Sequence, residues 1–247
     1  MKAPRLFLES VSGDVAVGRA LALPVNAAHH AADVLRMRTG DALTLFTGRG
    51  GEISTTIVRI AKRAVTVRVD AFDTVEREAP FDVTLVQALA ANDAMDYALR
   101  KAVELGAAAV QPLMTARSAR WPAGERGAQR LARWQQVAIA ACEQCGRNRV
   151  PAIHSATTWG EWLAARDPLR TGILLAPESS LGLAQIVPSM HGIDIAVGPE
   201  GGFADDEIAA GVQSGLIAAS LGPRVLRSET AGIATLAALH ALWGDFR

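Results

Sequence analysis

Two apolar runs that each end in a glycine turn constrain this chain most. Ile193–Val197 is followed by Gly198–Phe203 (GPEGGF), and the run from Leu216 to Leu221 is followed by Gly222-Pro223. Glycine turns of this kind let the chain leave a buried strand with its backbone N–H groups uncovered, so that a ligand can approach closely. If the runs are neighbouring parallel strands, both turns lie in the crevice where open α/β sheets bind ligands. Either turn alone fits an ordinary strand-to-helix connection equally well.

From residue 83 onward, segments typical of strands alternate with segments typical of helices. This alternation predicts parallel strands with crossover helices, and therefore an α/β domain with a mainly parallel sheet. The helix starting at Asn92 is the clearest, because its apolar residues have helical spacing, with Asn92 or Asp93 as its cap and Gly106 at its end. Strands are expected at 83–89, 107–110, 172–176, 193–197 and 216–221, and the last helix at about 230–243.

The first seventy residues have a different pattern, made mainly of short strands. Strands are expected at 5–8, 41–46, 53–60 and 65–69, with a glycine turn at 47–51 and one short helix at about 29–37. Closely spaced strands joined by glycine turns favour a small β-barrel. Acidic residues and Pro80 then indicate a linker, so we expect an N-terminal domain at 1–72, a linker at 73–82 and a second domain at 83–247.

Length and hydrophobicity restrict the class of protein. The chain has 247 residues, 50% of them hydrophobic, and can therefore bury a large core. Its apolar runs are shorter than a membrane span, and its first residues lead into no signal-peptide core. We expect a soluble, cytoplasmic protein with no membrane partner.

Charge is balanced overall but uneven along the sequence. The formal net charge is zero, yet residues 117–149 carry seven arginines and only Glu125 and Glu143 as acids. Arginine accounts for most of the 25 basic residues. Its planar guanidinium binds phosphate through two hydrogen bonds and stacks on bases, which favours RNA as a partner, although a GC-rich coding sequence would produce the same bias.

Cys142 and Cys145 form a C-x-x-C motif, for which we favour packing over redox or zinc chemistry. They lie near the end of an expected helix, whereas a reactive thiolate gains from a helix N-terminus, and no second cysteine pair supplies further zinc ligands. Cys142 also continues the apolar stripe of that helix. We expect no metal site.

The two glycine segments together resemble the ribosomal RNA small subunit methyltransferase E family, a branch of the SPOUT methyltransferases. The resemblance rests on GPEGGF at 198–203 and LGPRVLRSETA at 221–231, and it extends over nearly the whole chain. Further matches are Lys101–Gly106, Arg117-Ser118, Glu143-Gln144 with Arg147, Val150-Pro151, Leu174–Glu178 and, near the N-terminus, His29-His30 with Val34–Arg36.

The resemblance implies a fold and partners that the sequence pattern alone does not predict. It implies a PUA-like, RNA-binding barrel followed by a SPOUT α/β domain with a deep trefoil knot, although knots are almost absent among folds. It also implies a homodimer with the last helix near the interface, through Ile233, Leu236, Leu239 and Trp243. That apolar stripe fits an intramolecular core equally well.

The family's activity would be methylation of N3 of a uridine in 16S ribosomal RNA of the small subunit, with S-adenosylmethionine as cofactor. The resemblance implies that the cofactor is surrounded by Leu174, Leu175, Pro177, Glu178, Gly198, Glu200, Gly201, Gly202, Leu221, Gly222, Leu226, Ser228, Thr230 and Ala231. The chain departs from the family at Ala204, where a helix-capping serine is common, while Glu207 keeps the other half of the capping box. We expect this loss to weaken the helix by roughly 1 kcal/mol.

Uridine N3 carries a proton and is a poor nucleophile until that proton leaves. Arg227 is our candidate for holding a uracil oxygen or a phosphate, and Glu229 for accepting the proton, directly or through water. For Glu229 the pattern favours the simpler role of a first-turn acid that faces a helix dipole. Candidate RNA contacts are Arg5, Arg36, Arg38, Arg49, Arg117, Arg120 and Arg147. Two alternatives stay open: a SPOUT RNA methyltransferase with another target base, and a non-catalytic RNA-binding or ribosome-assembly factor.

Overall fold

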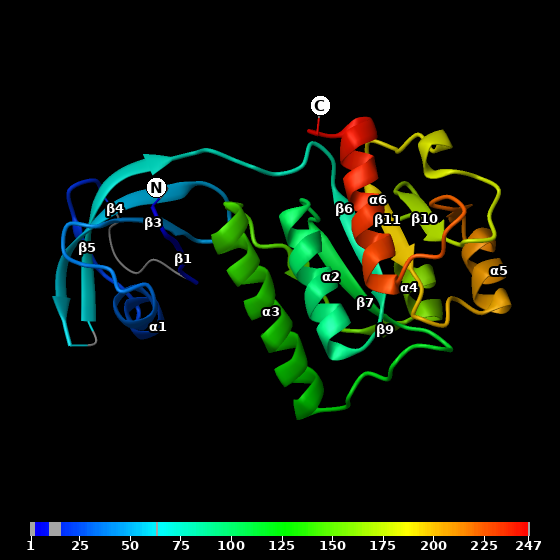
Figure 1. The fold of residues 1–247 in the computed structure, drawn as a ribbon, viewed down its shortest axis with the longest axis horizontal. Helices are drawn as coiled ribbons and strands as arrows, with labels where there is room; N and C mark the ends of the chain where they lie inside the picture. Colours follow the sequence, from blue (N-terminus) through cyan, green and yellow to red (C-terminus); the bar gives the residue numbers. More distant parts are fainter. Residues whose placement is uncertain (1–2, 10–15, 63, 247) are drawn as a thin grey trace. The chain divides into compact units, whose positions relative to one another are not determined.

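The computed structural model describes residues 3–9, 16–62 and 64–246 (Figure 1). The chain divides into two compact units. Unit 1 comprises Met1–Glu78 together with Cys142–Val150, and unit 2 comprises Ala79–Ala141 together with Pro151–Arg247. Residues 142–150 thus pack with the N-terminal strands, although they follow much later in the sequence.

Unit 1 is built on a five-stranded sheet with the order β1-β3-β4-β5-β2. Its strands are β1 (Arg5–Phe7), β2 (Ala20–Ala22), β3 (Ala42–Phe46), β4 (Glu52–Ala61) and β5 (Ala64–Asp73). β1 runs parallel to β3, and the other pairs are antiparallel. The expected strands of this region are confirmed; β2 was not foreseen, because three residues of the sequence Ala-Leu-Ala carry no alternating pattern.

The core of unit 1 follows from the alternation of side chains along these strands. Leu43 and Leu45 of β3 and Val65, Val67 and Val69 of β5 are buried on one face of the sheet. The helix α1 (Val25–His29), which continues as a π-helical segment (His30–Val34), contributes small buried alanines to the same core. The short helix thus begins earlier than the expected position at about 29–37.

Unit 2 contains a seven-stranded sheet in which every strand pair is parallel. The strand order is β12-β10-β11-β6-β7-β8, with the short β9 also paired to β7. The strands are β6 (Val83–Ala88), β7 (Ala109–Met114), β8 (Ala152–Ile153), β9 (Thr157–Thr158), β10 (Thr171–Leu175), β11 (Ile193–Val197) and β12 (Ile217–Ala219). The predicted α/β domain with a mainly parallel sheet is confirmed.

Helices cover both faces of this sheet. They are α2 (Asn92–Glu104), α4 (Trp159–Ala165), α5 (Asp205–Gln213) and α6 (Ser228–Trp243), with a short 3₁₀ turn at Leu183–Gln185. The long helix α3 (Glu125–Cys145) begins in unit 2, and its last residues, from Cys142 on, belong to unit 1. α2 and α6 pack side by side (Figure 1). A Cβ atom on Gly232 of α6 would lie 2.9 Å from Leu85 and 3.4 Å from Val197, so this helix approaches the sheet closely. On the opposite face, α4 and α5 pack against a core that includes Val86 and Leu174.

The start of α2 differs from the expected cap. Ala91, not Asn92 or Asp93, occupies the N-cap position, and its side chain makes no capping hydrogen bond. The side-chain oxygen of Asn92 instead accepts a hydrogen bond from Arg130 of α3. The Asn92 side chain, which the sequence predicted as a helix cap, is therefore used in a tertiary contact with α3 instead.

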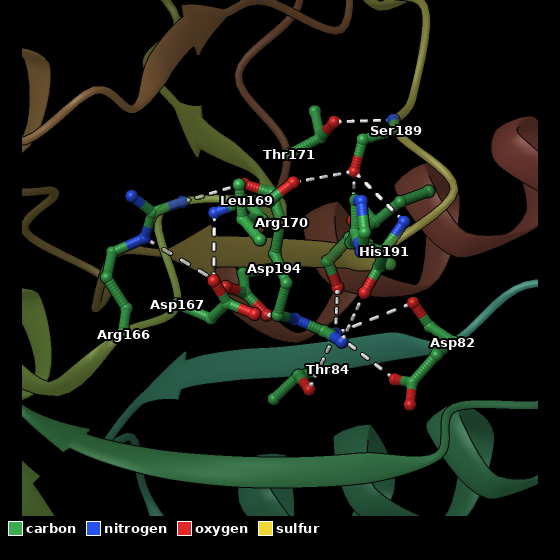
Figure 2. A network of polar contacts seen from close by, with 12 residues as sticks. Asp82, Thr84, Arg166, Asp167, Leu169, Arg170, Thr171, Ser189, His191 and Asp194 are labelled. Atoms are coloured by element: carbon green, nitrogen blue, oxygen red, sulfur yellow. Dashed lines mark hydrogen bonds and ion pairs between the residues drawn. The ribbon is translucent and has the colours of Figure 1, made fainter.

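The amino ends of β6, β10 and β11 are joined by a polar network centred on Arg170 (Figure 2). Its guanidinium donates hydrogen bonds to Asp194 Oδ1 (2.8 Å), Asp82 Oδ1 (3.1 Å) and Thr84 Oγ1 (3.2 Å). Burial raises the pKa of Asp194, and the hydrogen bond from Arg170 opposes that rise by favouring the charged carboxylate. The network fixes the edge of the sheet opposite to the glycine loops.

Candidate active site

The loops after β10, β11 and β12 lie at the carboxyl ends of three adjacent parallel strands. The expectation that β11 and β12 are neighbours is wrong, because β10 lies between them. Sequence order could not reveal this, since β10 precedes both strands in the chain. The loop after β10 therefore takes the middle place among the three, at the edge of the sheet where open α/β proteins bind ligands.

A buried hydrogen-bond relay ties the loop after β11 to the start of α6. Ser228 Oγ donates to the carbonyl oxygen of Gly198 (2.5 Å), and Gln87 Nε2 of β6 donates to Ser228 Oγ (2.8 Å). Because the single hydroxyl proton of Ser228 is used on Gly198, Gln87 must present its NH₂ group to the serine. The relay fixes three chain segments relative to one another.

The loop after β10 is joined to the end of β12 in a similar way. The amide of Ala176 donates to the carbonyl of Ala219 (2.9 Å), and Ser179 Oγ donates to the carbonyl of Ala218 (2.8 Å). Further along, the amide of Ser220 donates to the carbonyl of Leu181 (2.8 Å). All three loops are thus held at one edge of the sheet.

Glycine is required at specific points of the GPEGGF loop. A Cβ atom on Gly198 would lie 3.0 Å from the backbone nitrogen of Phe203, because the loop folds back on itself. Gly202 has a φ of +68°, in the left-handed region that glycine adopts without strain, and its amide closes a turn onto the carbonyl of Pro199 (2.9 Å). This tight turn leaves Glu200 and Gly201 exposed.

The helix α5 after this loop begins with half of a capping box. Ala204 stands at the N-cap with no side-chain hydrogen bond, while Glu207 Oε2 accepts from the amide of Ala204 (2.9 Å). Asp205 and Asp206 add negative charge to the first turn, where the helix dipole favours it.

The expected cofactor residues differ in whether their side chains are accessible to a ligand. Leu174 is fully buried in the core, so its side chain packs against the sheet and only its backbone remains for a ligand. Ser228 is also buried and serves the relay. The remaining ones are partly or fully exposed at the three loops: Leu175, Pro177, Glu178, Gly198, Glu200, Gly201, Gly202, Leu221, Gly222, Leu226, Thr230 and Ala231.

The two candidate catalytic residues lie at the N-terminus of α6. Arg227 is the exposed N-cap residue, and Glu229 is partly buried in the first turn. No hydrogen bond or ion pair involves either side chain within the residues that the structure describes, which leaves both heads available to a substrate. Since Ser228 lies between them, the relay also positions this pair.

Two candidate RNA contacts are buried in ion pairs of unit 1. Arg147 is 4% exposed and pairs with Glu78, and Arg5 pairs with Glu52 and donates to Asn148 Oδ1 (2.5 Å). Both guanidinium groups are buried and donate hydrogen bonds inside the unit, which argues against phosphate contact. We do not keep Arg5 and Arg147 in the RNA-contact set.

The other candidate arginines are exposed. Arg36, Arg38, Arg49 and Arg120 have solvent-accessible side chains, and Arg36 adopts a left-handed backbone (φ +53°) just after the helical segment ends. Arg117 is exposed too, but its Nη1 donates to the carbonyl of Gly201 (2.9 Å). It therefore belongs with the glycine loop as much as with the surface.

Sequence reasoning missed Gln87 and the structural role of Glu207. A signal for Gln87 was available, because it is a polar residue between the apolar Val86 and Ala88, and a polar side chain must find a partner once it is buried. Glu207 was recognised only as half of a local cap, yet its other carboxylate oxygen accepts from the amide of Ala116 (2.7 Å), a contact across 91 positions.

The C-x-x-C motif packs inside unit 1. Cys142 is buried, and burial raises the pKa of its thiol to about 12. The burial of Cys142 confirms that its side chain packs in a core, and the raised pKa means that burial disfavours the thiolate form. Among residues 3–9, 16–62 and 64–246, no cluster of three or more His, Cys, Asp or Glu could hold a metal ion.

No helix within the described part of the chain is both long and apolar enough to cross a membrane.

Comparisons with known proteins agree with this architecture. Residues 77–240 match the RNA methyltransferase domain family, and residues 23–70 match the RNA methyltransferase PUA domain family. A ribosomal RNA small subunit methyltransferase E from Mycobacterium bovis is 33% identical over 219 residues, which cover 86% of this chain and 83% of that protein.

Two solved structures are similar over the full length of both chains. One is a ribosomal RNA small subunit methyltransferase E from Neisseria gonorrhoeae bound to S-adenosylmethionine, with 36% identity and a TM-score of 0.92. The other, from Legionella pneumophila, is in complex with the same cofactor, with 34% identity and a TM-score of 0.90.

The present chain has a parallel sheet with three loops at its carboxyl ends, and both of its matched domains are those of RNA methyltransferases. These features define its class as an RNA methyltransferase with an attached PUA domain. Within that class, the chain belongs to the ribosomal RNA small subunit methyltransferase E family.

Proposed function

We propose that this protein uses S-adenosylmethionine to methylate N3 of a uridine in 16S ribosomal RNA of the small subunit. The observation that carries the proposal is the set of three linked loops at the carboxyl ends of β10, β11 and β12. The relatives with this fold over their whole length include two solved with S-adenosylmethionine.

The residues at these loops fit such a cofactor. At Gly202 and Gly222 nothing lies within 4 Å of the place that a Cβ atom would take, so a ligand can approach the backbone of both turns closely. Leu175, Leu221 and Leu226 are partly buried and supply apolar contact. When bound, the cofactor supplies a methyl group on a positively charged sulfur, which is already activated for transfer.

The chain's own contribution is to bind, orient and deprotonate. Arg227 would hold a uracil oxygen, or an adjacent phosphate, and would stabilise negative charge that develops on the base. Glu229 would accept the N3 proton, directly or through a water molecule. Their place on the first turn of α6, next to Ser228, keeps both at a fixed position relative to Gly198.

The finer features of the fold belong to the same proposal. We infer that the sheet of unit 1 closes as a PUA-like barrel and that unit 2 contains the deep trefoil knot of the SPOUT fold. Membership of the family supports both inferences. The expected domains, 1–72 and 83–247 with a linker at 73–82, need one change, because residues 73–78 and 142–150 belong to unit 1.

We further propose that the protein acts in the cytoplasm as a homodimer. Leu236 and Leu239 are buried within unit 2, whereas Trp243 at the end of α6 is 37% exposed and available to a second subunit. RNA contact is proposed for Arg36, Arg38, Arg49 and Arg120, with the 16S ribosomal RNA or the small subunit as partner.

The test is methylation of small-subunit RNA by the purified protein. Reverse transcription across the product should stop at one uridine, because a methyl group on N3 blocks base pairing. Arg227→Ala and Glu229→Gln should lower turnover while cofactor binding, measured by calorimetry, stays near that of the wild type. Cofactor binding without methylation of any base would favour a ribosome-assembly factor, and a stop at another base would change the target.

A further inference from the structure

We propose that Arg117 is a positioning residue that holds the GPEGGF loop in its cofactor-binding shape, with Glu207 as its support, and that it does not act as an RNA contact. The inference rests on the proposed cofactor role of that loop. It assigns a task to an exposed arginine and a buried carboxylate that the mechanism above does not use.

Arg117 clamps the loop through two backbone oxygens. Its Nη1 donates to the carbonyl of Gly201 (2.9 Å) and lies 3.4 Å from the carbonyl of Phe203. Hydrogen bonds from a charged donor are among the stronger ones in proteins. They hold the two carbonyls on the same side of the turn that the backbone makes at Gly202.

The aliphatic part of Arg117 packs on the same loop. A Cβ atom on Gly201 would lie 3.4 Å from Cδ and 3.5 Å from Cβ of Arg117, so the glycine backbone rests against the arginine stem. A side chain that served only phosphate would have no reason to cover a glycine in this way. Packing and hydrogen bonding therefore point to the same role.

The segment that carries Arg117 is itself fixed. Glu207 accepts from the amide of Ala116 through Oε1 (2.7 Å) and from the amide of Ala204 through Oε2 (2.9 Å). Ser118 Oγ accepts from the amide of Thr115 (2.9 Å), which closes the turn beneath the arginine. Glu207 is only 9% exposed, so this bridge is shielded from water.

The clamp connects loops whose strands are not neighbours. Arg117 follows β7 and the GPEGGF loop follows β11, and β6 lies between these strands in the sheet. The main-chain pairing of the sheet therefore cannot fix one loop against the other. The pair of contacts made by Arg117 and Glu207 supplies this missing constraint and preorganises the loop before the cofactor arrives.

The experiment measures cofactor affinity in the absence of RNA. Calorimetry with S-adenosylmethionine is run on the full-length wild type, Arg117→Ala, Arg117→Lys and the control Arg126→Ala, which removes an exposed arginine of α3. For Arg117→Ala we expect the dissociation constant of S-adenosylmethionine to rise roughly tenfold, because charged hydrogen bonds to the loop are lost. Arg117→Lys should recover part of the affinity, and Arg126→Ala should not change it.

Binding of small-subunit RNA separates the two roles. Arg117→Ala should bind RNA without cofactor as tightly as the wild type, whereas Arg120→Ala, from the proposed RNA-contact set, should bind RNA more weakly and keep its cofactor affinity. Normal cofactor affinity combined with weaker RNA binding in Arg117→Ala would overturn the inference and return the residue to the RNA surface.

Amide hydrogen exchange at residues 198–204 gives a readout that is independent of ligands. Arg117→Ala and Glu207→Gln should exchange faster there, while the exchange of β6 and β11 stays unchanged. Unchanged exchange in the loop would overturn the clamp. A wild type that binds no cofactor would refute the proposed function instead, and faster exchange would still support the clamp.

Discussion

Ser228 and Gln87 make different numbers of hydrogen bonds within the relay that anchors Gly198. Ser228 both donates to Gly198 and accepts from Gln87, so it is the only group of the relay that touches the other two. Gln87 makes one bond to Ser228 and a longer one to Ala88, and its Oε1 is buried with no partner within the described residues. Gln87 carries the larger polar group, yet we expect it to contribute less to the stability of the relay than Ser228.

This asymmetry predicts an order of stability. Ser228→Ala leaves the Gln87 amide and the Gly198 carbonyl without their shared partner and should cost about 1–3 kcal/mol. Gln87→Leu also removes the orphaned oxygen and should cost less than about 1 kcal/mol. Urea denaturation of both variants measures the difference, and a larger loss in Gln87→Leu would contradict the relay.

Glu52 makes the stability of unit 1 dependent on pH. Burial alone would raise the pKa of Glu52, but hydrogen bonds from Arg77 and Arg5 prevail and lower it to about 2, from an ordinary value of 4.5. A lowered pKa means that the carboxylate stabilises the folded state fully above about pH 4.5 and loses that contribution as the pH falls towards about 2.

Glu52→Gln should therefore remove about 1 kcal/mol of stability at pH 7, because solvent screens part of the interaction, and should flatten the decline between about pH 4.5 and 2. Denaturation curves over this range, followed by a probe in unit 1, provide the measurement. Parallel curves for variant and wild type would show that the ion pairs contribute little.

At the scale of helices and strands, sequence pattern predicted long elements well and short ones poorly. β11 and α2 were expected within a residue or two of their bounds, because their apolar residues repeat over a full element. The two-residue strands β8 and β9 have no such period. α4 was missed although Thr158 and Glu161 form a capping box, a signal that the sequence does contain.

The half-capped helix α5 should be easy to stabilise. Ala204 already has N-cap backbone angles (φ −75°, ψ 158°), so Ala204→Ser needs no rearrangement and supplies the missing acceptor. We expect a gain of about 1 kcal/mol in the free energy of unfolding. The control Ala209→Ser, on the exposed side of the same helix, should lower stability slightly, because serine is the poorer helix former.

At the scale of the whole molecule, the sequence predicted two domains but not the membership of residues 142–150. The side chain of Asn148 donates to the carbonyl of Val75 (2.8 Å), and its backbone carbonyl accepts from the amide of Gly50 (3.1 Å). Contacts over such separations leave no periodic trace in a sequence. The order of β10, β11 and β12 was hidden for the same reason.

A fragment that ends at Glu78 should consequently be unstable. It would keep all five strands of unit 1 but lose Asn148 and the backbone pairing of Val150 with Gly48 (3.1 Å). We expect the fragment to unfold at a clearly lower urea concentration than unit 1 of the full chain. Circular dichroism follows the unfolding of both proteins in urea. Equal urea midpoints for the fragment and for unit 1 of the full chain would mean that residues 142–150 are dispensable for unit 1.

The central place of β11 also has a consequence for how the protein is made. β6 meets β7 soon after synthesis, but its partner on the other side, β11, begins only at Ile193, about a hundred residues later. At roughly 5–20 residues per second, a ribosome needs on the order of 5–20 s to supply it. We therefore expect the newborn chain to carry an apolar strand with one open edge for that time, and an open edge invites pairing with other chains until β11 arrives.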